Sequence, residues 1–117
     1  MNRRSLLWPL ALASAFVVGA ALNAGMHSAR AAGTHKIGMM NSTYGPGAIS
    51  AKVGDTVVFD NDDYENHWVY SPTVDHQMSK AGIKPGEKFE LLLGKPGKFL
   101  VLCALHTKMT TTITVVK

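Results

Sequence analysis

The sequence predicts an all-β domain of about seven to eight short strands arranged as a sandwich and preceded by an export signal. After residue 32 the chain alternates runs rich in Val, Ile, Thr and Phe with turns rich in Gly, Pro, Asp and Asn. Regular spacing of this kind is typical of sandwiches and barrels. The same region contains no run with the apolar period of an amphipathic helix. We therefore expect residues 33–117 to form one β domain.

Residues 1–32 have the order of segments found in secretory signal peptides. Two arginines near the start precede a long apolar run, and small residues follow it. Cleavage after Ala31 or after Ala32 would release residues 33–117 into the periplasm, with no stable membrane association. The apolar run also approaches the roughly 20 residues that cross a bilayer, so a leader retained as an anchor is the alternative.

The first half of the domain is expected to contain three strands. Residues 35–40 form the first, and a loop over residues 41–47, with a Gly-Pro-Gly turn, ends it. Residues 48–52 form a short extended segment. A Gly-Asp turn then leads into the β-branched run at residues 56–59.

The second half is expected to contain four strands and two irregular stretches. Polar residues 60–66 form a loop, and residues 71–86, interrupted by Pro and Gly, carry no strand pattern. A Gly-Lys-Pro-Gly turn joins two of the strands. In the last strand threonines alternate with apolar side chains, which makes one face more apolar than the other. These strands are expected at residues 67–70, 88–93, 99–102 and 110–116.

The charge balance of the domain excludes one broad class of function. All three arginines lie in the leader, so residues 33–117 keep nine lysines against eight acidic residues, a formal charge of +1. No basic patch with interleaved aromatic residues is present, so nucleic acid is not an expected partner. The sequence also lacks a Ser-His-Asp order and a phosphate loop, and Asp62-Asp63 reads as a turn. The chain is therefore not expected to be an enzyme.

A single cysteine is unusual for an exported domain of about 85 residues, since such small domains often rely on disulfides. Cys103 has no possible partner in its own chain. It is a metal ligand, an intermolecular crosslink, a reactive thiol or a buried apolar side chain. The segment around it favours the first of these, because His106 follows after two intervening residues and Met109 after two more.

These side chains supply the donors of a copper site. A soft thiolate, two imidazoles and a weak axial thioether bind copper in trigonal blue-copper sites, which transfer electrons. Cys103, His106 and Met109 provide three of the four donors, and His67 far upstream provides the second imidazole. For Met109 taken alone, packing in the core is an equal alternative. One type 1 copper ion is thus the expected cofactor.

Several segments, taken in chain order, are similar to those of one known family. They are residues 44–46, 53–57, 59–62, 82–87 and 97–99, with His67 and the Cys103 loop. The chain resembles the cupredoxins, the small blue-copper electron carriers. Two-residue intervals from Cys to His and from His to Met resemble amicyanin, whereas plastocyanin and pseudoazurin have a longer second interval. The resemblance implies a Greek-key sandwich whose copper ligands are His67, Cys103, His106 and Met109.

The resemblance also implies a function and a mode of partner contact. A cupredoxin carries single electrons between larger redox proteins, here a dehydrogenase or a cytochrome. This chain, as a monomer, would dock through an apolar surface around His106, formed by Leu105, Ala104 and Pro46. The main alternative is a periplasmic copper carrier or sensor that hands on the ion rather than an electron. A domain that serves only as an interaction module is a further alternative.

Three positions depart from the family pattern. Cupredoxins usually carry Asn after the first His ligand and often Ser or Thr after the Cys, and these two side chains join the ligand loops. Here the positions hold Trp68 and Ala104, so we expect apolar packing of the indole to replace the polar connection. Leu105 stands where amicyanin and plastocyanin have Pro, which predicts a less rigid loop.

Other potential donors give weaker signals. Glu65 could compete as a carboxylate ligand, although a solvated loop acid is the simpler interpretation. Cleavage after Ala32 would create a Gly33-Thr34-His35 terminus that could chelate Cu(II). Of two adjacent methionines in the first strand, at least one is expected in the core. The remaining donors are expected in ordinary loop or strand positions: His76, Met78, Met39 and Met40.

Overall fold

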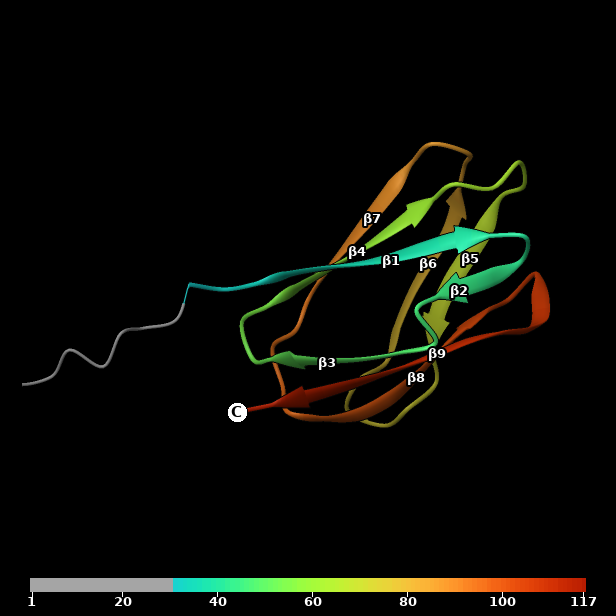
Figure 1. The fold of residues 1–117 in the computed structure, drawn as a ribbon. Helices are drawn as coiled ribbons and strands as arrows, with labels where there is room; N and C mark the ends of the chain where they lie inside the picture. Colours follow the sequence, from blue (N-terminus) through green and yellow to red (C-terminus); the bar gives the residue numbers. More distant parts are fainter. Residues whose placement is uncertain (1–30) are drawn as a thin grey trace, which may run out of the picture.

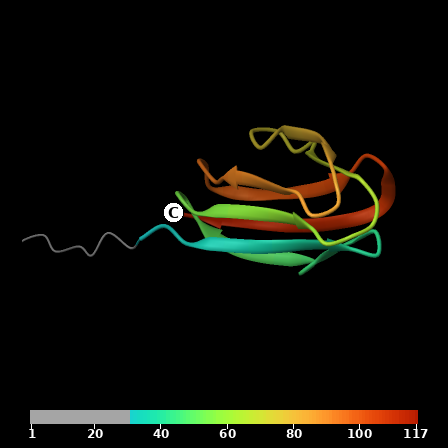
Figure 2. The same ribbon diagram turned by 90° about the horizontal axis from the view of Figure 1, so that it is seen from above.

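The structure is a computed structural model that describes residues 31–117, and these contain nine strands in two facing sheets (Figures 1 and 2). The predicted leader lies outside this range, except for its last two positions, and stays a prediction. Within the range, no helix has the length and apolar character needed to cross a membrane. The strands are β1 Thr34–Met40, β2 Thr43–Gly45, β3 Ala48–Lys52, β4 Thr56–Asn61, β5 His67–Ser71, β6 Met78–Ile83, β7 Lys88–Leu92, β8 Gly97–Cys103 and β9 His106–Val116.

The sandwich consists of one sheet of four strands and one of five. The first has the order β2-β1-β4-β7, and the second has the order β3-β9-β8-β5-β6. Both sheets are mixed, because β1 with β4 and β3 with β9 are parallel pairs among otherwise antiparallel neighbours. β8 and β9 form a hairpin inside the second sheet, so the turn between them lies at one end of the sandwich (Figure 1).

The core fills the space between the sheets, as the apolar alternation predicted. In β9, Ile113 and Val115 are buried, while Thr112 and Thr114, which alternate with them, keep partial exposure. Phe59 is fully buried and its ring centroid lies 6.0 Å from that of Tyr44 and 5.9 Å from that of Phe89. Burying a side chain of this size contributes about 1.5–3 kcal/mol, so packing of this kind holds the two sheets together.

Two strands occupy segments that the sequence assigned to loops. The three-residue β2 pairs with β1, and Tyr44 is its only buried residue. The six-residue β6 lies in the segment expected to be irregular, and Ile83 is its only fully buried residue. Both strands lie at sheet edges. Backbone pairing rather than side-chain burial defines them, so neither leaves an apolar alternation in the sequence.

Candidate metal centre

The predicted ligands converge at one end of the sandwich, where the β8-β9 turn meets the loop before β5. Cys103 ends β8, and a two-residue turn separates it from His106, the first residue of β9. This last strand therefore begins earlier than the predicted Thr110. His67 is the first residue of β5, which lies beside β8 in the same sheet. Three neighbouring strands thus bring the cysteine and both histidines together.

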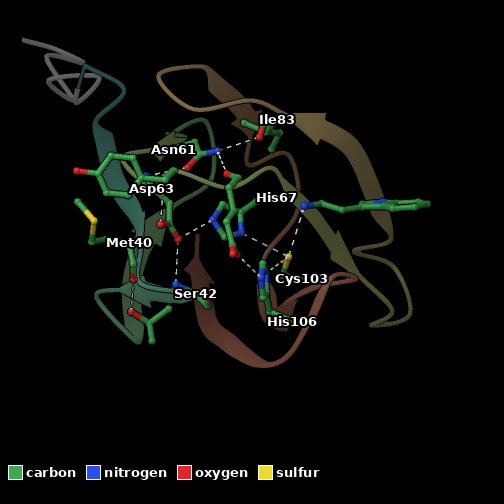
Figure 3. Close-up of polar contacts among 12 residues, drawn as sticks. Met40, Ser42, Asn61, Asp63, His67, Ile83, Cys103 and His106 are labelled. Carbon is green, nitrogen blue, oxygen red and sulfur yellow. Dashed lines mark hydrogen bonds and ion pairs between the residues drawn. The ribbon is translucent and has the colours of Figure 1, made fainter.

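Both imidazoles direct the same nitrogen at the cysteine sulfur (Figure 3). Cys103 Sγ lies 3.7 Å from His67 Nδ1 and 3.6 Å from His106 Nδ1. The two ring centroids are 5.0 Å apart, and one donor atom from each of the three residues lies within 4.8 Å of the others. His67 and Cys103 are buried, whereas the His106 side chain keeps 23% of its surface exposed. One sulfur and two nitrogens that face a common point fit a small, soft metal ion.

Main-chain hydrogen bonds connect the two ligand loops at the sulfur. The Trp68 amide donates to Cys103 Sγ at 3.4 Å, and the Ala104 amide donates to the Trp68 carbonyl at 2.9 Å. The side chains at positions 68 and 104 do not join the loops by a hydrogen bond, as expected, but the backbone does. The indole lies at the surface, where its Nε1 donates to Ser79 of β6 at 2.7 Å. The N–H that points at the sulfur helps to hold Cys103 Sγ in place beside the two imidazoles.

The outer nitrogens of both imidazoles contact carboxylates from the loop between β4 and β5. His67 Nε2 lies 3.1 Å from Asp63 Oδ2, and His106 Nε2 lies 2.8 Å from Glu65 Oε2. Glu65 thus contacts the ring nitrogen that faces away from the sulfur, and it is not one of the clustered donors. The structure therefore does not support Glu65 as a competing ligand. Asp63, expected only as a turn residue, is the partner of a predicted ligand.

A buried asparagine fixes this loop. Asn61 Nδ2 donates to the carbonyl of Glu65 at 2.8 Å and to that of Ile83 at 2.9 Å. Its Oδ1 accepts a hydrogen bond from the Asp63 amide at 2.9 Å. The Asn61 side chain is fully buried, and leaving any of these groups unpaired there would cost about 1–3 kcal/mol. The end of β4 therefore fixes the backbone that carries both carboxylates.

Asp63 itself has several donors. The amides of Ser42 and Tyr64 donate to its carboxylate at 3.0 and 2.9 Å. These two amides, with a further contribution from His67, hold the pKa of Asp63 below its usual range. Sequence reasoning did not assign Asn61 or Asp63 to the site. The available signal was the polar run over residues 60–66, which follows an apolar strand and leads directly to a predicted ligand.

Met109 lies in β9, and its side chain is buried in the core. Burial in the core is what a packing side chain would show, and the role of Met109 as an axial ligand stays a prediction. Other sequence candidates lie apart from the cluster: His76 stacks on a phenylalanine ring at a centroid distance of 4.7 Å, and His35 Nε2 lies 2.9 Å from Asp55 Oδ2. Of the two adjacent methionines Met39 is fully buried, as predicted for at least one of them.

Residues 10–115 match the family described as the cupredoxin-like domain. This chain belongs to the cupredoxin family. No curated protein sequence matches it. The cupredoxin fold, the soft donors and the amide aimed at the sulfur are together consistent with one type 1 copper ion.

Solved structures share the cupredoxin fold with this chain. One is a copper-containing nitrite reductase from Thermus scotoductus SA-01, with a TM-score of 0.67, 22% identity and coverage of 72% of this chain. This cupredoxin spans only 22% of that enzyme's length. The purple cupredoxin from Nitrosopumilus maritimus has a TM-score of 0.63 and 23% identity, covering 70% of this chain and 99% of its own. A reduced amicyanin mutant has a TM-score of 0.66 and 20% identity, covering 71% and 82%.

Proposed function

We propose that this cupredoxin carries single electrons between redox partner proteins, with one type 1 copper ion bound by His67, Cys103, His106 and Met109. The observation that carries the proposal is the convergence of two Nδ1 atoms, at 3.7 and 3.6 Å, on a buried free cysteine sulfur. Copper bound there would supply a one-electron change between Cu(II) and Cu(I). A thiolate with two imidazoles binds both oxidation states, as an electron carrier requires.

Each of the four side chains has its own part in this function. Cys103 supplies the sulfur ligand, to which the Trp68 amide donates a hydrogen bond. His67 is fully buried, so its ring keeps one orientation through repeated cycles. Met109, buried in β9, supplies the weak axial bond that adjusts the reduction potential. His106 has an exposed edge and provides the shortest route for an electron to the surface.

The surface around His106 suits a short-lived contact with a dehydrogenase or a cytochrome. Leu105 exposes 55% of its surface, and Ala104 beside it is also exposed. Pro46, whose carbonyl accepts a hydrogen bond from Thr111 of β9, is exposed as well. Small apolar surfaces of this kind are typical of weak electron-transfer complexes. A monomer that meets its partners in turn fits this surface.

The leader pattern supports export to the periplasm, where residues 33–117 would act after cleavage at Ala31 or Ala32. Mass spectrometry of the protein recovered from the periplasm of expressing cells tests this part of the proposal. A mass that includes the whole leader would contradict it.

Visible absorption and EPR spectroscopy of the purified protein after addition of Cu(II) test the proposed function, with Cys103→Ser as the matched control. We expect an intense thiolate-to-copper band that the substitution removes and that a mild reductant bleaches reversibly. A pale spectrum that is indifferent to Cys103→Ser would mean that copper binds elsewhere. That result would reject the electron carrier and support the copper carrier in its place.

A further inference from the structure

The two imidazoles of the metal centre share one arrangement of hydrogen bonds. In each ring Nδ1 faces the Cys103 sulfur and Nε2 faces a carboxylate. Figure 3 shows Asp63 and Cys103 on opposite sides of His67. A neutral imidazole whose Nε2–H donates to a carboxylate has an unprotonated Nδ1, and only an unprotonated nitrogen binds a metal. The hydrogen bonds therefore select the ring form that the site needs.

One short loop supplies both carboxylates, and the fold fixes that loop. Asn61, fully buried at the end of β4, accepts from the Asp63 amide and donates to the Glu65 carbonyl. The second Nδ2 bond of Asn61, to the Ile83 carbonyl, joins the loop to β6 of the other sheet. Although the Glu65 carboxylate is 62% exposed, its backbone is held within reach of His106. The contact therefore does not depend on a freely moving loop.

The two carboxylates differ in their surroundings. Asp63 is 8% exposed and accepts two amide hydrogen bonds besides its contact with His67, so those donors offset much of its charge. Among residues 31–117, His106 is the one side chain with a polar contact to the Glu65 carboxylate. Its charge acts almost entirely on the ring that reaches the surface. We therefore expect Asp63 mainly to orient the His67 ring, and Glu65 to act on the His106 ring mainly through its charge.

We propose that Asp63 and Glu65 form a carboxylate clamp on the two histidines, in which Asp63 positions His67 and the charge of Glu65 stabilises the oxidised centre. The oxidised centre carries one more positive charge than the reduced one, so a carboxylate beside a ligand favours it. The charge effect rests on the proposed function, because it concerns bound copper. The positioning of the rings is a property of the metal-free protein as well.

Glu65→Gln tests the charge, because glutamine keeps an oxygen that can accept from His106 Nε2. We expect a higher reduction potential in the copper-loaded variant. The ratio of its Cu(II) to Cu(I) affinities should fall about two- to five-fold, as is usual for partly exposed charge pairs. Added salt screens the charge of Glu65, so it should reduce the difference in reduction potential between the variant and the wild type. Glu90→Gln is the matched control, since Glu90 is an exposed acid on β7 in the other sheet. Equal potentials in the two variants would overturn the charge effect.

NMR of the metal-free protein tests the positioning without copper. ¹H–¹⁵N spectra at a pH where the rings are neutral report which nitrogen carries the proton. We expect Nε2–H in both His67 and His106 of the wild-type protein, and a mixture of both forms in His106 after Glu65→Ala. Because the Glu65 side chain is mostly exposed, this variant should keep the fold. An Nδ1–H ring in the wild-type protein, or a His106 ring that Glu65→Ala leaves unchanged, would overturn the clamp.

The two measurements also separate this inference from the proposed function. A wild-type protein without a thiolate-to-copper band would remove the proposed function, and the NMR result would still decide the positioning. A normal band with a Glu65→Gln potential equal to that of wild type would leave the function in place and remove the charge effect alone.

Discussion

Two aspartates at opposite ends of β4 hold an imidazole in nearly the same way, yet only one of them lies at the candidate metal centre. Asp55, directly before the strand, contacts His35 Nε2 at 2.9 Å and accepts from two backbone amides at 2.7 and 3.0 Å. Asp63, just beyond the strand, contacts His67 Nε2 at 3.1 Å and accepts from two amides at 3.0 and 2.9 Å. The local chemistry of the two pairs is the same.

The difference lies in the other nitrogen of each ring. His67 Nδ1 faces the Cys103 sulfur, which comes from a strand 36 positions later. Among residues 31–117, the group of side chains that could hold a metal contains His67, Cys103 and His106 and does not include His35. An aspartate fixes the ring in both places. The two places differ in the sulfur that a distant strand brings to the other nitrogen of His67.

Removing His67 and His35 in turn should give the largest difference in copper binding between the two ends of β4. His67→Ala deletes one of three strong donors, so we expect the thiolate-to-copper band to disappear, whereas His35→Ala should leave it intact. Absorption after Cu(II) addition measures this, with circular dichroism to verify that both variants fold. A band that survives His67→Ala, or one that His35→Ala abolishes, would break the distinction.

A negative charge placed on the surface at each end of β9 should show which end docks with a redox partner. Leu105→Glu introduces a carboxylate beside His106, and we expect electron exchange with a partner to slow about tenfold while the copper spectrum stays the same. Val116→Glu, at an exposed position of β9 at the other end, should leave the rate unchanged. Stopped-flow mixing with a redox protein measures both rates. A lost spectrum in Leu105→Glu would show that the residue supports the site and does not serve docking.

Acid should lower the free energy of unfolding through Asp55 and Asp63 alike, and this is the smallest expected effect. His35 first, then the amides of Lys52 and Gly33, hold the pKa of Asp55 well below its usual range, and the pKa of Asp63 is lowered as well. In the unfolded chain such carboxyls titrate near pH ~3.9. The unfolded state therefore takes up protons first as the pH falls. The free energy of unfolding contributed by these groups is complete above about pH 4 and decreases below it.

Urea unfolding of the metal-free protein between pH 7 and pH 3 measures the effect of acid. Asp55→Asn has nothing to titrate at that position, so it should lose less stability in acid than the wild-type protein does. Asp63→Asn should reduce the acid loss in the same sense. An acid loss as steep in both variants as in wild type would show that neither carboxylate is responsible for it.

The predictable parts of this protein were those that leave a local pattern. The spacing from Cys103 to His106 is local, and burial of alternate residues, as in β9, marks most strands in the sequence. Edge strand β6 buries almost nothing, so it left no such pattern. The roles of Asn61 and Glu65 depend on contacts with Ile83 and His106. Contacts between residues far apart in the chain require the folded structure, which is why sequence reasoning missed both roles.

Both ends of the described chain lie at the pole of the sandwich far from the proposed copper ligands. The Thr56 amide donates to the Gly33 carbonyl and the Val53 amide donates to the Val116 carbonyl, each at 2.9 Å, and Figure 1 shows the two ends on the same side of the sandwich, opposite the β8-β9 turn. β9 has 11 residues from His106 to Val116, which at about 3.3 Å each amounts to about 35 Å. A tether, electrode or fused domain joined at either terminus would therefore be separated from the centre by insulating protein. Electron exchange with a partner would then take place only at the opposite pole, beside His106.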